Sequence, residues 1–163
     1  MPVFALLDPK RHDRTAFVCG ETSLDRYLRE QAAQHHRDGI ATTHVALTDS
    51  ASSRILGYYT LSAAQALLDD LQDADRRRLP RYPIPAARLA RLAIAHEEQR
   101  KGLGGALLAH AVQRCLQLRA ELGVRLLIVD ALNERAARFY EAFGFRQTTS
   151  AAATWYLSLG KAD

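Results

Sequence analysis

A short glycine-rich segment is the part of the sequence with the clearest chemical potential. It reads Gln99-Arg100-Lys101-Gly102-Leu103-Gly104-Gly105 and directly precedes a long amphipathic stretch. Glycines let the backbone approach an anion closely, and the first amides of a helix have no partner inside the helix. The helix dipole and the side chains of Arg100 and Lys101 add positive charge. The segment therefore predicts a site for a pyrophosphate group, although a glycine cluster taken alone is also compatible with an ordinary turn.

The segment matches neither of the two common nucleotide-binding loops. The dinucleotide fingerprint has the spacing GxGxxG followed by an acidic residue about 20 positions later, and a Walker loop needs Gly-Lys followed by Ser or Thr. Neither pattern is present in the segment.

Positive charge is concentrated between Arg76 and Lys101. The whole chain has a formal net charge of +4, whereas this segment holds eight Arg and Lys residues against Glu97 and Glu98, a net charge of +6. A local basic region favours an anionic partner such as a phosphate-bearing cofactor or a nucleic acid, with a solvated charged surface as the alternative. The candidates for contact with nucleic acid are Arg76, Arg77, Arg78, Arg81 and Arg88.

Strands and helices alternate in the second half of the chain, which predicts an α/β fold. The long helix has apolar residues at helical spacing, with His110 on its polar face and Gly123 as its stop. Asn133 is placed to cap the next helix and Gly144 to end it. The elements expected are strands at 88–95 and 125–130, helices at 103–122 and 133–143, and final strands within 148–159.

The first half of the chain reads as further strands with one helix. Pro80, Pro83 and Pro85 should end any regular element in their region, because proline lacks an amide hydrogen. The elements expected are a strand at 3–7, a helix at 24–37 with Ser23 as its N-cap, strands at 43–48 and 55–63 joined by a polar loop, and a short helix or loop at 69–79.

Length and composition exclude several protein classes. The 163 residues fit one domain, 1–163, and a hydrophobic fraction of 48% with 25% charged residues is ordinary for a globular protein. No apolar run is long enough for a transmembrane helix, and the first residues lack the pattern of a secretory signal. Cys19 and Cys115 are far apart with no CxxC pair, which favours a reducing cytoplasm and predicts no metal site.

The second half of the chain resembles the GNAT superfamily of acetyltransferases. The resemblance rests on the order strand, Gln/Arg-x-x-Gly-x-Gly/Ala, long helix and strand, then on Asn133 and the segment Ala-Arg-Phe-Tyr-Glu-Ala-Phe-Gly-Phe at 137–145. It covers about residues 88–145. It implies a mixed α/β (α+β) fold in which helices flank a central twisted sheet of about six to seven strands.

The resemblance also implies acetyl-CoA as the acetyl donor and assigns the site residues. The pantetheine arm would lie along Leu92, Ala93 and Ile94, and Asn133 would be a further contact. The pyrophosphate would bind around Gln99, Arg100, Lys101, Gly102, Leu103, Gly104 and Gly105.

Tyr140 is the catalytic residue that the resemblance implies, because in the GNAT pattern this tyrosine lies beside the thioester sulfur. A phenol can donate a proton to the departing thiolate. Its spacing with Ala136 and Phe143 is equally that of a core aromatic. A general base is harder to assign: His96, Glu97 and Glu98 follow the strand where acetyltransferases often place one, but they also read as a solvated turn.

The N-terminal half is similar to the GNAT toxins of bacterial type II toxin–antitoxin pairs. The matching segments are Phe17-Val18-Cys19-Gly20, Leu24-Asp25-Arg26-Tyr27-Leu28, Thr43-His44-Val45, Gly57-Tyr58-Tyr59-Thr60-Leu61-Ser62, Arg91-Leu92-Ala93-Ile94 and Val129-Asp130-Ala131. This resemblance implies a cytoplasmic enzyme, commonly a homodimer, that acetylates the amino group of a charged tRNA and blocks translation. It also implies a cognate antitoxin with a ribbon-helix-helix DNA-binding domain.

The absence of an obvious general base fits an aminoacyl ester as substrate better than a lysine. An α-amine titrates near pH 7.7–8.0 and an ester lowers this further, whereas a lysine at about 10.4 needs a base. The alternatives are a GNAT enzyme that acetylates a small amine or a protein N-terminus, and a non-catalytic GNAT-fold binding or regulatory protein.

Overall fold

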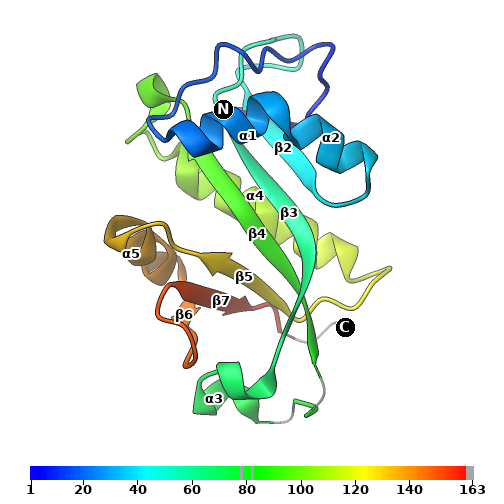
Figure 1. The fold of residues 1–163 in the computed structure, drawn as a ribbon, viewed down its shortest axis with the longest axis vertical. Coiled ribbons are helices and arrows are strands. Elements are labelled where there is room, and N and C mark those ends of the chain that lie inside the picture. The colour runs from blue at the N-terminus through cyan, green and yellow to red at the C-terminus, as the bar shows by residue number, and fades with distance from the viewer. Residues whose placement is uncertain (78, 82, 161–163) are drawn as a thin grey trace. The chain divides into compact units, whose positions relative to one another are not determined.

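The protein is a mixed α/β structure built on one seven-stranded sheet. The computed structural model describes residues 1–77, 79–81 and 83–160 (Figure 1). The strand order is β1-β2-β3-β4-β5-β7-β6, which confirms the expected fold class. The chain falls into two compact units: unit 1 contains residues 1–62 and 90–111, and unit 2 contains residues 63–89 and 112–163.

Unit 1 packs helices against the antiparallel strands β1, β2 and β3. Its core joins Leu24, Tyr27 and Leu28 of the first helix to Val45 and Tyr58 of the strands. The elements with residues in this unit are β1 (Val3–Leu6), α1 (Thr22–Glu30), α2 (Ala32–Arg37), β2 (Thr42–Leu47), β3 (Gly57–Ala66), β4 (Ile84–Ile94), η2 (His96–Glu98) and α4 (Leu103–Leu118).

The expected helix at 24–37 is two helices, and Ser23 is not its N-cap. Glu21 is the extended residue before α1, so Ser23 lies inside the first turn. Gln31 leaves the helical conformation and separates α1 from α2. Nothing in the local sequence marks this break, since neither proline nor glycine is present. The break accompanies a tertiary contact, because His35 Nδ1 lies 2.9 Å from the Tyr27 hydroxyl.

Unit 2 packs around a parallel pair and an antiparallel pair of strands. β4 pairs with β5 from Ala86 to Leu89, and β5 pairs with β7 along its whole length. Besides its parts of β3, β4 and α4, the unit contains η1 (Leu68–Asp70), α3 (Asp73–Arg76), β5 (Leu126–Asp130), α5 (Glu134–Phe143), β6 (Arg146–Gln147) and β7 (Thr154–Ser158).

Several boundaries differ from the sequence predictions, among them those of β3, expected at 55–63 and found at Gly57–Ala66. β4 begins at Ile84 and includes Pro85, which is tolerated because pairing with β5 starts only at Ala86. Helix α4 ends at Leu118, four residues early, where Arg119 Nη1 donates to the carbonyls of residues 159 and 160 at 2.9 and 2.8 Å. The last strands occupy only parts of the region after residue 145, with residues 148–153 forming a loop.

His110 is not on a solvated polar face of α4, as the periodicity predicted. It is half-buried, its ring stacks on Phe4 at 4.4 Å between centroids, and its Nδ1 lies 2.7 Å from the Tyr59 hydroxyl. Helical spacing identifies the less apolar side of a helix. It cannot show that this side packs against a strand rather than facing solvent, as the side of His110 does here.

None of the helices formed by the described residues is both long and apolar enough to cross a bilayer. Within the same residues, no group of three or more His, Cys, Asp and Glu side chains is arranged to hold a metal ion.

Candidate functional site

In unit 1 the glycine-rich segment forms a tight turn that leads into α4. The backbone of Arg100 has a φ of 66° and that of Gly102 a φ of 85°, so two left-handed residues flank Lys101. A left-handed arginine is uncommon and marks a turn that the surrounding structure imposes. The Ala106 amide donates to the Gly102 carbonyl at 3.2 Å, so the helical ladder begins there. The amides of residues 103–105 precede that ladder, as an anion site at a helix start requires.

Gln99 ties this turn to the rest of unit 1. Its Nε2 donates to the carbonyls of Cys19 at 2.7 Å and Ile94 at 3.0 Å. The side chain predicted to contact the cofactor is therefore engaged within the protein, where it holds the end of β4 beside the turn.

The residues at the turn fit a phosphate group. A Cβ added at Gly102 or Gly105 would meet nothing within 4 Å, so open space lies beside the backbone there. Gly57 is different, because a Cβ added there would lie 2.8 Å from Leu107 Cδ1 and 3.0 Å from the Ala93 carbonyl oxygen. Gly57 is thus required for packing, whereas the turn glycines leave room for a ligand.

The acidic residues after β4 are engaged in ion pairs. Glu98 lies 3.1 Å from Lys101 Nζ and 3.8 Å from Arg54 Nη1, and Glu97 lies 3.2 Å from Arg54 Nη2. These contacts agree with the solvated charged turn that was the alternative to a general base. They also leave Arg100, which is exposed, as the cation of the turn without an ion pair to any described residue.

In unit 2 Asn133 directly precedes α5, and Tyr140 lies within the helix, about two turns further on. The Asn133 side-chain oxygen accepts a hydrogen bond from the Ala136 amide at 2.9 Å, so Asn133 caps the helix as predicted. The Tyr140 side chain is 6% exposed, and its ring contacts those of Phe139 and Phe145. Within the described part of the chain, no hydrogen bond engages its hydroxyl. Burial raises the pKa of Tyr140 to about 12, so the phenol stays protonated near neutral pH. In catalysis it can therefore donate a proton but cannot act as a base.

We expect this burial to appear in the alkaline stability of the protein. Because folding raises the pKa of Tyr140 from 10 to about 12, its contribution is complete below pH 10 and is lost as the pH rises toward 12. The loss amounts to about 2 to 3 kcal/mol of unfolding free energy. Urea unfolding between pH 9 and roughly 11.5 measures it. The Tyr140→Phe variant should lose less over the same range, and an equal loss in both proteins contradicts the assignment.

The arginines predicted to bind nucleic acid differ in whether they form ion pairs within the protein. Arg76 pairs with Asp69 at 2.9 Å and with a second carboxylate at 3.4 Å, and Arg88 pairs with Asp130 at 2.7 Å. The exposed Arg77 and Arg81 form no ion pair with any described residue. Arg78 lies outside the described residues.

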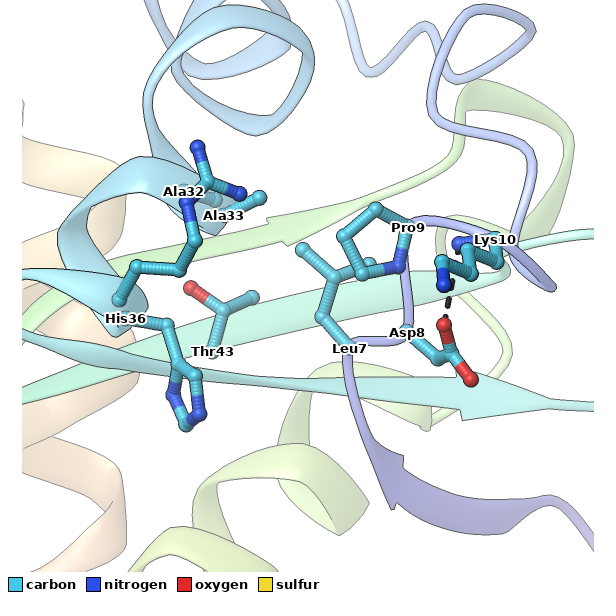
Figure 2. A pocket seen from close by; sticks show the side chains of 9 residues that line it. Leu7, Asp8, Pro9, Lys10, Ala32, Ala33, His36 and Thr43 are labelled. Carbon is cyan, nitrogen blue, oxygen red and sulfur yellow. Dashed lines mark hydrogen bonds between the residues drawn. The ribbon is translucent and has the colours of Figure 1, made fainter.

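Unit 1 also has a pocket of about 460 Å³ that sequence reasoning missed. Figure 2 shows its lining, in which the apolar side chains of Leu7 and Pro9 lie among polar and charged ones, such as Asp8 and His36. The lining comes from segments distant in sequence, so no local pattern could have found it. The lining residues are Leu7, Asp8, Pro9 and Lys10 after β1, Ala32, Ala33, His36 and Arg37 of α2, and Thr43 of β2.

Comparison with known proteins assigns the family. The acetyltransferase (GNAT) domain matches residues 40–147. The chain is 38% identical over 133 residues to a tRNA-acetylating toxin of Mycobacterium tuberculosis, covering 82% of this chain and 78% of the toxin. AtaT complexed with acetyl-methionyl-tRNAfMet has a TM-score of 0.90 and 27% identity, covering 97% of this chain and 95% of that chain. A variant of AtaT bound to acetyl-CoA and the C-terminus of the antitoxin AtaR has a TM-score of 0.81 and 27% identity, covering 97% and 93%. This chain therefore belongs to the GNAT acetyltransferase family.

Proposed function

We propose that this protein is an acetyl-CoA-dependent N-acetyltransferase that acetylates the amino group of aminoacyl-tRNA and, as a toxin, blocks translation. The observation that carries the proposal is the 38% identity to a tRNA-acetylating toxin over 82% of this chain. The solved complex of AtaT with acetyl-methionyl-tRNAfMet, at a TM-score of 0.90, supports the same substrate class.

The residues that bind acetyl-CoA in this proposal come mainly from unit 1. The free amides at the start of α4 and the Arg100 guanidinium bind the pyrophosphate, for which the glycine positions leave open space. Residues 92–94 of β4 hold the pantetheine arm, and Asn133 supplies a further contact with the amide group that its capping bond leaves free.

When bound, acetyl-CoA supplies an acetyl group activated as a thioester. The substrate amine forms the new bond to the acetyl carbon and releases a proton to solvent. The Tyr140 hydroxyl would donate its proton to the sulfur as the carbon–sulfur bond breaks, so that CoA leaves as a neutral thiol. Because burial raises the pKa of Tyr140 to about 12, the resulting phenolate is strongly basic and would regain a proton from solvent. An α-amine with a pKa near 8 is partly neutral already, so no dedicated base is needed.

Mass spectrometry of bulk charged tRNA incubated with the protein and acetyl-CoA tests the proposal. We expect aminoacyl groups that carry one added acetyl group. Acetylation of only a small amine or a peptide N-terminus would favour the first alternative. No turnover with any amine, despite acetyl-CoA binding, would favour a non-catalytic protein.

The exposed arginines of the basic segment should bind tRNA through its phosphates. Arginine forks match phosphate oxygens, and each neutralised phosphate contributes about 0.7–0.9 to the slope of log affinity against log salt. The Arg77→Ala/Arg81→Ala double variant should therefore reduce that slope by about 1.4–1.8 and raise the KM for charged tRNA. Arg114→Ala, on the exposed side of α4, is the control. A double variant with the slope and affinity of the unmodified protein would exclude this role.

We also propose that the protein forms a homodimer, works in the cytoplasm on charged tRNA, and pairs with an antitoxin that has a ribbon-helix-helix domain. The complexes of AtaT with AtaR, one of them bound to DNA, support an antitoxin partner that contacts DNA. Light scattering of the purified protein tests the dimer.

A further inference from the structure

Arg91 is held in an unusual position in unit 1. Its guanidinium carbon lies over the Tyr27 ring, 3.6 Å from the ring centroid. The Tyr27 side chain is 1% exposed, and its hydroxyl lies 2.9 Å from His35 Nδ1, so the ring is a fixed platform. An arginine stacked in this way has lost most of its side-chain freedom before any ligand arrives.

The guanidinium of Arg91 has no anionic partner among the described residues. No carboxylate of the described residues lies within 4.0 Å of it, and none of those residues forms a hydrogen bond with its five donors. Arg88, three residues earlier on the same strand, pairs with Asp130 at 2.7 Å. Arg91 is half-buried, and its charge acts on the buried phenols of Tyr27 and Tyr58, opposing the rise in pKa that burial causes. A cation in such surroundings with unused donors is poised to bind an anion.

The position of Arg91 indicates which anion this is. It directly precedes residues 92–94, the part of β4 that holds the pantetheine arm in the proposed function. In the proposed function the phosphates of acetyl-CoA are bound by the amides at the start of α4 and by Arg100, so Arg91 is not needed for them. Because the Arg91 guanidinium stacks face-on over the Tyr27 ring, its N–H groups, which lie in the guanidinium plane, are not covered by the ring. Two of these N–H groups have the spacing to donate to two oxygens of one phosphate.

We propose that Arg91 binds a backbone phosphate near the aminoacylated 3′ end of the charged tRNA and thereby positions the amino group. This inference rests on the proposed function and adds the residue that holds the acceptor end. Arg91 is a positioning residue in this role, because it contacts the substrate away from the reacting atoms.

Two substitutions of Arg91 separate the effect of its positive charge from that of the planar shape of its guanidinium. Arg91→Met keeps an unbranched apolar stem over Tyr27 and removes the charge, and Arg91→Lys keeps the charge and loses the fork. Arg114→Met is the matched control, because Arg114 is exposed on α4 and, among the described residues, its guanidinium forms a hydrogen bond only with Gln117. We would measure kcat and KM for charged tRNA over a salt series, acetyl-CoA affinity by calorimetry, and the melting temperature.

We expect Arg91→Met to raise the KM for charged tRNA by roughly 10- to 100-fold, the range for one lost hydrogen-bonded charge. Its slope of log KM against log salt should be smaller by about 0.7–0.9, which corresponds to one phosphate. Arg91→Lys should restore the slope but only part of the affinity. The acetyl-CoA affinity of both variants, and of Arg114→Met, should stay within about twofold of the unmodified protein.

Three results would overturn the inference. An unchanged KM and salt slope in Arg91→Met would exclude a phosphate contact, and lost acetyl-CoA affinity would assign the arginine to the cofactor. A lower melting temperature with reduced kcat but an unchanged KM would show a role in folding only. Filter binding of charged tRNA to the same variants keeps this test separate from the proposed function, because it reports the contact even if no acetyl group is transferred.

Discussion

Replacing Tyr140 with phenylalanine should lower kcat by roughly 10²- to 10⁴-fold, the usual scale for a lost acid catalyst. The fold and the affinity for acetyl-CoA should be retained, because the ring is 6% exposed and phenylalanine fills the same volume. Only the hydroxyl is removed, and it has no hydrogen bond with the described residues. Steady-state rates with charged tRNA and calorimetry with CoA measure the two effects separately.

Tyr156 provides the matched control for this experiment. It is also buried in unit 2, and its hydroxyl donates to Asp75 Oδ2 at 2.5 Å and accepts from the Gln72 amide at 2.9 Å. Tyr156→Phe should therefore lose about 1–3 kcal/mol of stability with little change in kcat. Turnover of Tyr140→Phe within about twofold of the unmodified protein would falsify the catalytic role of Tyr140.

The second large effect is expected at the start of α4. Gly104→Val should weaken acetyl-CoA binding by roughly 10- to 100-fold, because a branched side chain would stand where the pyrophosphate approaches the amides. Helix content should change little, since the substitution lies in the first turn of a helix that extends from Leu103 to Leu118. Titration calorimetry with CoA and circular dichroism measure the two quantities.

Two further variants make this result specific. Gly105→Ala places a Cβ where no protein atom lies within 4 Å, so any loss of CoA affinity reports the ligand rather than a clash within the protein. Ala109→Val puts the same branched side chain on an exposed position of α4, beyond the first turn, and should leave CoA affinity unchanged. Equal affinity of Gly104→Val and Ala109→Val would rule out the pyrophosphate site at this turn.

Local sequence signals were reliable where a single interaction decides the structure. Asn133 caps α5 because its side chain reaches an amide three residues away, and Gly144 ends the same helix in the left-handed conformation. The glycine-rich turn was recognised for the same reason, since its geometry depends on adjacent residues. The mixed α/β class followed from the alternation of apolar patterns along the chain.

Local sequence signals could not predict contacts between residues far apart in the chain. The ion pairs Arg88–Asp130 and Arg54–Glu97 join residues more than 40 positions apart, and they removed cations and acids that the sequence offered for binding and catalysis. The burial of His110 has the same origin, because it accompanies a contact with Tyr59, 51 positions earlier in the chain.

The sequence by itself determined the fold class, the family resemblance and the residues at the turn and on α5 that carry the proposed chemistry. The tertiary structure decided which charged groups are available. Charge along a chain is local information, but whether a guanidinium meets a carboxylate or a tyrosine ring depends on which strands pair and which helix faces pack. That is why Arg76, Arg88 and Arg91 look equivalent in the sequence, whereas of these three Arg91 alone has a guanidinium without an anionic partner among the described residues.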